Sequence, residues 1–172
     1  MKRASASSLM LILTLSIGLT AASIMAIGPA NLYAAGPVAA PCESLYRKKA
    51  IPAKTLQALV RAHERWMEQR SNPEGRRAEL CQADLSRAML LGANLERAQL
   101  EGAVLRQANL HQANLSQASL AEADLSRATL DYSILSGADL RRATLTGANL
   151  FRAIGDEAAL FNAVLVGARL RE

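Results

Sequence analysis

Alanine and leucine recur with a period of five along the C-terminal part of the chain. From residue 78 to residue 172, the sequence divides into nineteen consecutive five-residue units without an insertion. Alanine opens every unit except the one that begins at Ser133, and leucine holds every third position except that of Gly155. This register predicts a repeat architecture in which each unit adds the same small part to a shared core.

A period of five fits neither a helix nor a flat strand. On an α-helix, successive leucines would turn by about 500° per unit and would wind around every face. In a flat strand, the odd spacing would send successive leucines to opposite faces. All leucines stay inside if the chain runs extended through Ala-x-Leu and then turns a corner through two polar or small residues. Four such corners close a coil of about twenty residues.

These coils are expected to stack about 4.8 Å apart, joined by backbone hydrogen bonds. The array then has about 4.75 coils and is roughly 23 Å long at that spacing. The predicted fold class is an all-β solenoid. One interior column is predicted to contain Leu85, Leu105, Leu125, Leu145 and Leu165.

Residues 52–70 have the periodicity of an amphipathic helix. Its apolar side chains recur at spacings of three and four along one face, at Leu56, Leu59, Val60, His63, Trp66 and Met67. The open end of a first coil would expose apolar surface and unpaired backbone groups. We therefore expect this helix to cap that end through Leu59, His63 and Trp66, with Trp66 buried near Leu80 and Leu85.

The array resembles the pentapeptide-repeat family, whose signature is A(D/N)LXX. The units that carry this signature begin at residues 83, 93, 108, 113, 123, 138 and 148. The resemblance covers residues 78–172, and the helical segment before them resembles the lead-in of other such arrays. It implies a right-handed quadrilateral β-helix with an N-terminal α-helical cap. The handedness comes from the resemblance alone.

Residues 1–40 have the pattern of a cleaved export signal. Lys2 and Arg3 form a basic start, an apolar centre runs from residue 9 to residue 19, and no further charge appears before Glu43. Small residues that suit a cleavage site follow, at Ala34, Ala35, Ala39 and Ala40. The alternative is a retained membrane anchor, which the serines and threonines of the segment disfavour. We expect a periplasmic or extracellular protein without a stable membrane span after processing.

The positive charge lies outside the array. Residues 41–77, which form a linker and the helix, carry nine basic and four acidic residues, whereas residues 78–172 carry nine basic and eleven acidic ones. The chain has a net charge of +5, but the array alone is slightly negative. The basic run from Arg47 to Lys49 suits an anionic surface, although a solvated flank explains it more simply.

The two cysteines and two histidines are the candidates for chemistry. In an exported protein, Cys42 and an outward-facing Cys81 are predicted to form a disulfide, with two free thiols as the alternative. His63 is expected to pack beside Trp66 with one nitrogen hydrogen-bonded, and His111 to lie solvated at a corner. No catalytic triad, metal-binding spacing or phosphate-binding loop occurs in the sequence. We therefore expect no enzymatic activity, no cofactor and no metal.

Two features mark the C-terminal coil. Gly155 removes a central leucine, and we expect the chain to bulge there and turn Ile154 inward rather than leave a cavity. Large apolar residues also occupy outward positions, at Phe151, Ile154, Phe161, Val164 and Val166. Together with an uncovered coil end, this cluster predicts an interface, and we expect a homodimer through the last coil.

The sequence favours a protein-binding or scaffolding solenoid whose partner is a protein or another component of the cell envelope. The alternative comes from relatives that mimic duplex DNA and bind type II topoisomerases, thereby protecting them from quinolones. Such mimicry requires a strongly negative rod in the cytoplasm. The small charge of the array and the export signal both count against it, so no nucleic-acid partner is expected.

Overall fold

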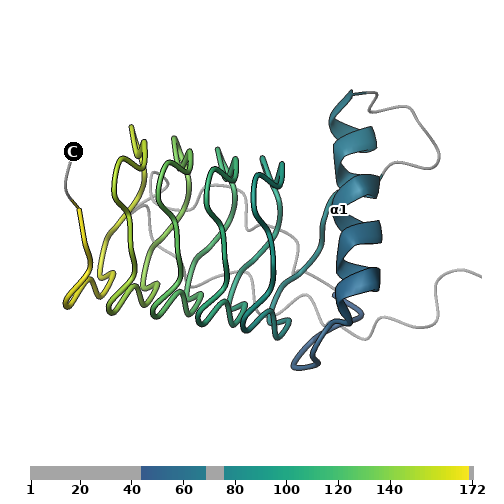
Figure 1. The fold of residues 1–172 in the computed structure, drawn as a ribbon, viewed down its shortest axis with the longest axis horizontal. Helices are drawn as coiled ribbons and strands as arrows, with labels where there is room; N and C mark the ends of the chain where they lie inside the picture. The colour runs from purple at the N-terminus through teal and green to yellow at the C-terminus, as the bar shows by residue number, and fades with distance from the viewer. Residues whose placement is uncertain (1–43, 69–75, 171–172) are drawn as a thin grey trace, which may run out of the picture. The chain divides into compact units, whose positions relative to one another are not determined.

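The structure is a computed structural model, which describes residues 44–68 and 76–170. One helix, α1 (Ala53–Glu68), precedes a stack of coils formed by the repeats (Figure 1). It confirms the helix predicted over residues 52–70, of which residues 69 and 70 lie outside the described residues. The expected export signal and Cys42 also lie outside them.

Parallel backbone bridges join residues that are twenty positions apart, from Glu79 and Gln99 at one end to Asn149 and Arg169 at the other. Twenty residues are four five-residue units, so each unit stacks on the unit four places further along. Each contact is an isolated bridge, and the described residues contain no longer β-strand. The stacked-coil solenoid is thereby confirmed, whereas its right-handedness stays a prediction.

Units in adjacent coils are joined by the same backbone hydrogen bonds along the array. The N–H of Leu90 donates to the carbonyl of Asn109 at 2.8 Å, and the N–H of Asn109 donates back to the carbonyl of Ala88 at 2.9 Å. At the corner, the N–H of Ala88 donates to the carbonyl of Leu85 at 3.0 Å, which closes a β-turn. The backbone groups of the interior are thus satisfied between coils and at corners.

The fifth residue of each unit adopts a left-handed conformation. From Gln82 to Gly167, all eighteen of these residues have φ between 54° and 68°. A positive φ at the third residue of a turn is typical of type II turns and favours glycine, yet most of these positions carry long polar side chains. The sequence suggested turns at the corners but did not reveal this repeated strain.

The Asp or Asn at the second position of a unit supports the corner that follows. All seven such side chains accept a hydrogen bond from the backbone N–H two residues later, at 3.0–3.4 Å; they are Asp84, Asn94, Asn109, Asn114, Asp124, Asp139 and Asn149. This contact is an Asx turn, which Asp and Asn form readily. The recurring acids and amides therefore have a structural role in the repeat.

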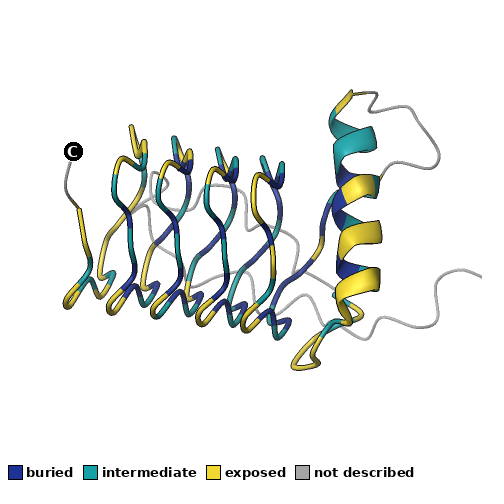
Figure 2. Cartoon of the chain, viewed as in Figure 1, coloured by how far each residue is buried: buried dark blue, intermediate teal, exposed yellow. Residues whose placement is uncertain are grey.

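The interior consists of the first and third residues of the units (Figure 2). In the predicted leucine column, Leu85, Leu105, Leu125 and Leu145 are buried, whereas Leu165 in the last coil is half-buried. Ser133, which replaces an alanine, is buried and donates its hydroxyl to the carbonyl of Leu130 at 2.7 Å. The period-five burial pattern is confirmed.

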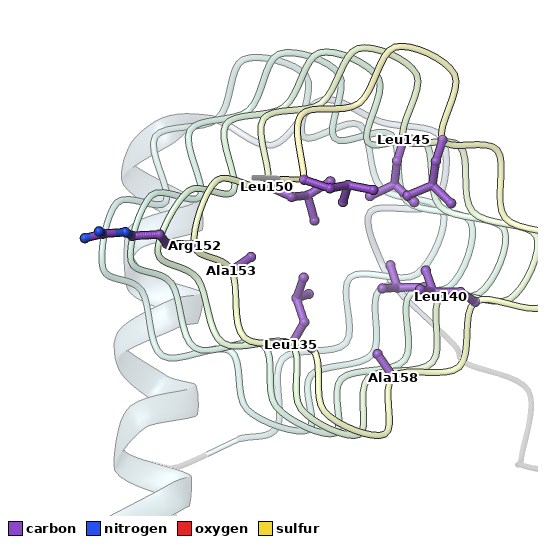
Figure 3. Close-up of a pocket in the computed structure, with 11 residues that line it drawn as sticks. Leu135, Leu140, Leu145, Leu150, Arg152, Ala153 and Ala158 are labelled. Atoms are coloured by element: carbon purple, nitrogen blue, oxygen red, sulfur yellow. The ribbon is translucent and has the colours of Figure 1, made fainter. Parts of the chain in front are cut away.

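The bulge expected at Gly155 is wrong. Ile154 keeps its bridge to Ile134 and is half exposed, so it does not turn inward. The backbone hydrogen bonds between coils hold the register, and the missing leucine leaves space in its place. A cavity of about 180 Å³ opens there, at the C-terminal end of the interior, lined by Gly155, Leu135, Leu150 and Leu160 among others (Figure 3).

Candidate functional site

Helix α1 is joined to the first coil through His63. Its ring is fully buried, and both nitrogens are bonded: Nδ1 accepts the N–H of Ala78 at 3.1 Å, and Nε2 lies 2.9 Å from the carbonyl of Glu96. Because Nδ1 accepts, the proton must sit on Nε2, which donates to that carbonyl. Burial lowers the pKa of His63, which keeps the ring neutral. The expectation of a single bonded nitrogen was therefore wrong.

The other expected contacts of the helix are formed only in part. Leu56 and Val60 are buried in the core, and Leu59 packs against it while half-buried. Trp66 is half-buried and stacks on His63 at a ring distance of 5.6 Å. Its predicted burial was wrong, because the helix turns the Leu56–Val60–His63 stripe toward the coil and leaves Trp66 beside that stripe.

An extended segment before the helix pairs with one edge of the first coil. The N–H of Lys48 donates to the carbonyl of Gln82 at 2.6 Å, and the N–H of Asp84 donates to the carbonyl of Lys49 at 3.0 Å. Cys81 holds the fourth, outward position of its unit, and it is only 3% exposed. Cys81 is no free thiol in the structure. Since Cys42 lies outside the described residues, the Cys42–Cys81 pairing stays a prediction.

The C-terminal coil exposes large apolar side chains, as the sequence indicated. We call Ile154, Phe161, Val164 and Val166 the C-terminal patch; Phe161 and Val166 are 72% and 70% exposed. Phe151 differs from these four, because it is half-buried. Exposed interior leucines border the end of the coil, at Leu160 and Leu170.

A polar and aromatic cluster follows one corner of the solenoid, and sequence analysis did not identify it. Nδ1 of His111 lies 2.5 Å from a carboxylate oxygen of Asp131, so the expectation of a solvated histidine was wrong. Tyr132 contacts His111 and Phe151 edge-on, and the Arg152 guanidinium lies over both the Tyr132 and Phe151 rings. The sequence could have revealed this cluster, because a spacing of twenty positions places these residues at the same corner of adjacent coils.

Charged side chains on the coils form short-range pairs. The Arg141 guanidinium donates to the Asp139 carboxylate at 2.6 Å, and Arg142 pairs with Glu122 at 3.2 Å. The bond from Arg141 lowers the pKa of Asp139. Neither pair joins a nucleophile to a base. Within residues 44–68 and 76–170, no group of three or more His, Cys, Asp or Glu side chains is placed to hold a metal.

No helix among the described residues has both the length and the apolar character needed to cross a bilayer. The candidate sites are three surfaces: the coil faces, the α1 junction and the C-terminal patch. These features define the chain as a β-solenoid of stacked five-residue units.

The chain belongs to the pentapeptide-repeat family. The family model for pentapeptide repeats matches residues 76–107, 108–147 and 138–172, in eight copies. No curated protein matches the sequence.

Solved structures of pentapeptide-repeat proteins resemble the chain. One from the thylakoid lumen of Arabidopsis thaliana is 26% identical, with 54% of this chain and 68% of that one covered and a TM-score of 0.44. Rfr23 of the cyanobacterium Cyanothece 51142 is 36% identical, with coverages of 51% and 56% and a TM-score of 0.40. QnrB1, a plasmid-mediated fluoroquinolone resistance protein, is 17% identical, with coverages of 52% and 61% and a TM-score of 0.26.

Proposed function

We propose that the chain is an exported, non-enzymatic solenoid that binds or scaffolds other proteins. The observation that carries this proposal is the C-terminal patch, because several large apolar side chains are exposed around the last coil and exposed apolar surface marks interaction sites. Phe161 and Val166 lie at neighbouring corners of the last coil and are largely exposed. The rest of the array carries paired charges and Asx turns, which suit a rigid support.

A second copy of the chain is the simplest partner for this patch, which would give a homodimer. Exposed Leu160 and Leu170 continue the apolar surface across the end of the last coil. Two copies that meet end to end around a two-fold axis would cover this surface without leaving a second open one. We expect light scattering at roughly tens of micromolar to give a dimer mass, because association depends on protomer concentration. A monomer that Phe161→Asp leaves unchanged would rule out this dimer.

Partners other than a second copy are tested by affinity purification from the exported fraction. The wild-type protein and Phe161→Asp serve as the matched baits. We expect specific proteins to be retained by the wild type and lost with the variant. If both baits retain the same proteins, the C-terminal patch is not their binding surface.

The structure gives little support to the alternative function, mimicry of duplex DNA. The acidic side chains that such a rod would display are partly neutralised, because Asp139, Glu122 and Asp124 each pair with an arginine. With nine basic and eleven acidic residues in the array, electrostatic resemblance to a duplex is weak. Purified protein is therefore expected to leave supercoiling by a type II topoisomerase unchanged.

A further inference from the structure

One edge of the first coil has free backbone groups. Among the described residues, the N–H of Met89 has no hydrogen-bond acceptor, and neither its carbonyl nor that of Leu91 has a donor. Both side chains are apolar and unusually exposed for the array, at 69% for Met89 and 57% for Leu91. We call this stretch, residues 88–92, the Met89 edge. An exposed strand edge of this kind is a template for pairing.

The neighbouring edge shows how such groups are satisfied in this molecule. There, Asp84 occupies the position that corresponds to Met89 one unit earlier. Its N–H donates to the carbonyl of Lys49, and its carbonyl accepts the N–H of Ile51 at 3.4 Å. An extended segment has therefore taken the place of a preceding coil on that face, whereas no described segment pairs with the Met89 edge.

A groove runs along the Met89 edge beside α1. Its volume is about 280 Å³, and it lies between Met89, Leu90 and Leu91 of the coil and one flank of the helix. Apolar Leu56 and Val60 line the helix side, together with the polar side chains of Gln57, Arg61 and Glu64. The groove therefore combines apolar side chains, a polar rim and free backbone groups.

We propose that the Met89 edge binds one extended apolar peptide segment of a partner protein by β-strand addition. This site deepens the proposed protein-binding function and lies apart from the C-terminal patch. Added strands gain affinity from main-chain hydrogen bonds and specificity from side-chain contacts. A second folded copy is the poorer occupant, because α1 borders the groove and would obstruct another stack of coils.

The array specifies the register of the added strand. Between the first two coils, the N–H groups of Leu90 and Gly92 donate to Asn109 and His111, and Asn109 donates to Ala88. By the same pattern, the third and fifth residues of a bound unit donate to the carbonyls of Met89 and Leu91. The first residue of that unit accepts the N–H of Met89, and the second residue contacts the Met89 side chain.

A blocked peptide with one repeat unit between lysines, acetyl-Lys-Ala-Val-Leu-Ser-Gly-Lys-amide, tests this register. We expect it to bind the purified protein with a Kd of about 1 mM or tighter, and to slow hydrogen exchange at the Met89 amide. N-methylation of its leucine and glycine removes both donors, so affinity should fall about tenfold or more. N-methylation of its valine is the matched control, because that N–H points away from the edge.

Protein variants locate the site. Met89→Asp should abolish binding while circular dichroism and the melting temperature stay close to those of the wild type, because the side chain is exposed. Phe161→Asp should bind the peptide as the wild type does. The proposal is overturned if the peptide does not bind, if both methylated peptides bind alike, or if Phe161→Asp removes binding. The last result would assign the peptide to the C-terminal patch. If instead the protein forms no dimer and retains no partner proteins, the proposed role of the C-terminal patch fails, while the peptide test of the Met89 edge still stands.

Discussion

Nδ1 of His63 accepts the backbone N–H of Ala78, the first residue of the array. This bond connects the middle of α1 to the point where the solenoid begins. It requires an unprotonated Nδ1, since a protonated ring has two donors and no acceptor. The attachment of the helix is therefore sensitive to the charge of one buried side chain.

Acidification is expected to destabilise the protein through His63. Its pKa is lowered in the folded state, chiefly by burial and opposed by the hydrogen bond to Glu96, with Arg77 lowering it and Glu64 raising it. The unfolded chain then binds more protons once the pH falls below the ordinary value of about 6.5. The contribution of neutral His63 to the free energy of unfolding is fully present above that pH, and it decreases as the pH drops toward the folded-state pKa. Urea unfolding midpoints at several pH values measure this decrease.

A variant without the His63 imidazole provides the control for this pH dependence. His63→Gln should lower the midpoint at neutral pH and flatten the profile between about pH 7 and 5. An identical profile in His63→Gln would show that other groups cause the acid sensitivity.

Filling the cavity at Gly155 is expected to stabilise the solenoid. The residue has no positive φ, and an added Cβ would meet only the Cβ of Ala158, at an ordinary contact of 4.0 Å. Gly155→Leu would restore the missing core side chain and should add about 1 kcal/mol, less than full burial gives because the end is open. Thermal unfolding should show a rise of a few degrees.

Gly167 provides the comparison, because it also has open space around its Cβ position but has φ +68°. Gly167→Leu should lower the melting temperature, since a side chain there is strained. If Gly155→Leu also lowers it, the cavity does not accept a leucine.

Removal of an Asx turn is expected to cost about 1 kcal/mol. Asn114 accepts both the N–H and the hydroxyl of Ser116, at 3.0 Å and 2.7 Å. Asn114→Ala leaves this corner without its side-chain acceptor, so the urea midpoint should decrease. Thr129→Ala is the control, because Thr129 has the same position in its unit and no such bond. Equal losses in both variants would argue that the asparagine acts only through the coil face.

The Cys42–Cys81 disulfide is expected to stabilise the mature protein by roughly 4 kcal/mol in the chain-entropy model. Alkylation under denaturing, non-reducing conditions followed by mass analysis should find neither thiol modified. Modification of both cysteines would exclude the bond. Reduction should lower the melting temperature of the wild type but not that of Cys42→Ser/Cys81→Ser.

The period of five alone predicted which residues form the core, because a spacing that is neither helical nor that of a flat strand leaves few ways to keep Leu85 and Leu105 inside. It also predicted exposure at Phe161. It did not predict the left-handed corners, since residues such as Arg97 carry no signal for positive φ. The second bond of His63 depends on the carbonyl of Glu96, which only the packed coil brings near.

The sequence also led to a wrong choice at Gly155. A bulge avoids an empty volume, but it would break the hydrogen bonds that Ile154 makes with Ser133 and Leu135. Those bonds outweigh the loss of one side chain at a partly open end.

The bridges join residues that are twenty positions apart, so the side of the solenoid on which a residue lies depends on how many five-residue units precede it. Inserting or deleting one five-residue unit would preserve the core register but move every later outward residue to the next side. Side chains such as Tyr132 and Arg152, which now share a corner, would separate if the change fell between them. A change of four units would restore each later residue to its side and alter only the length, so surfaces on this scaffold evolve most easily by whole coils.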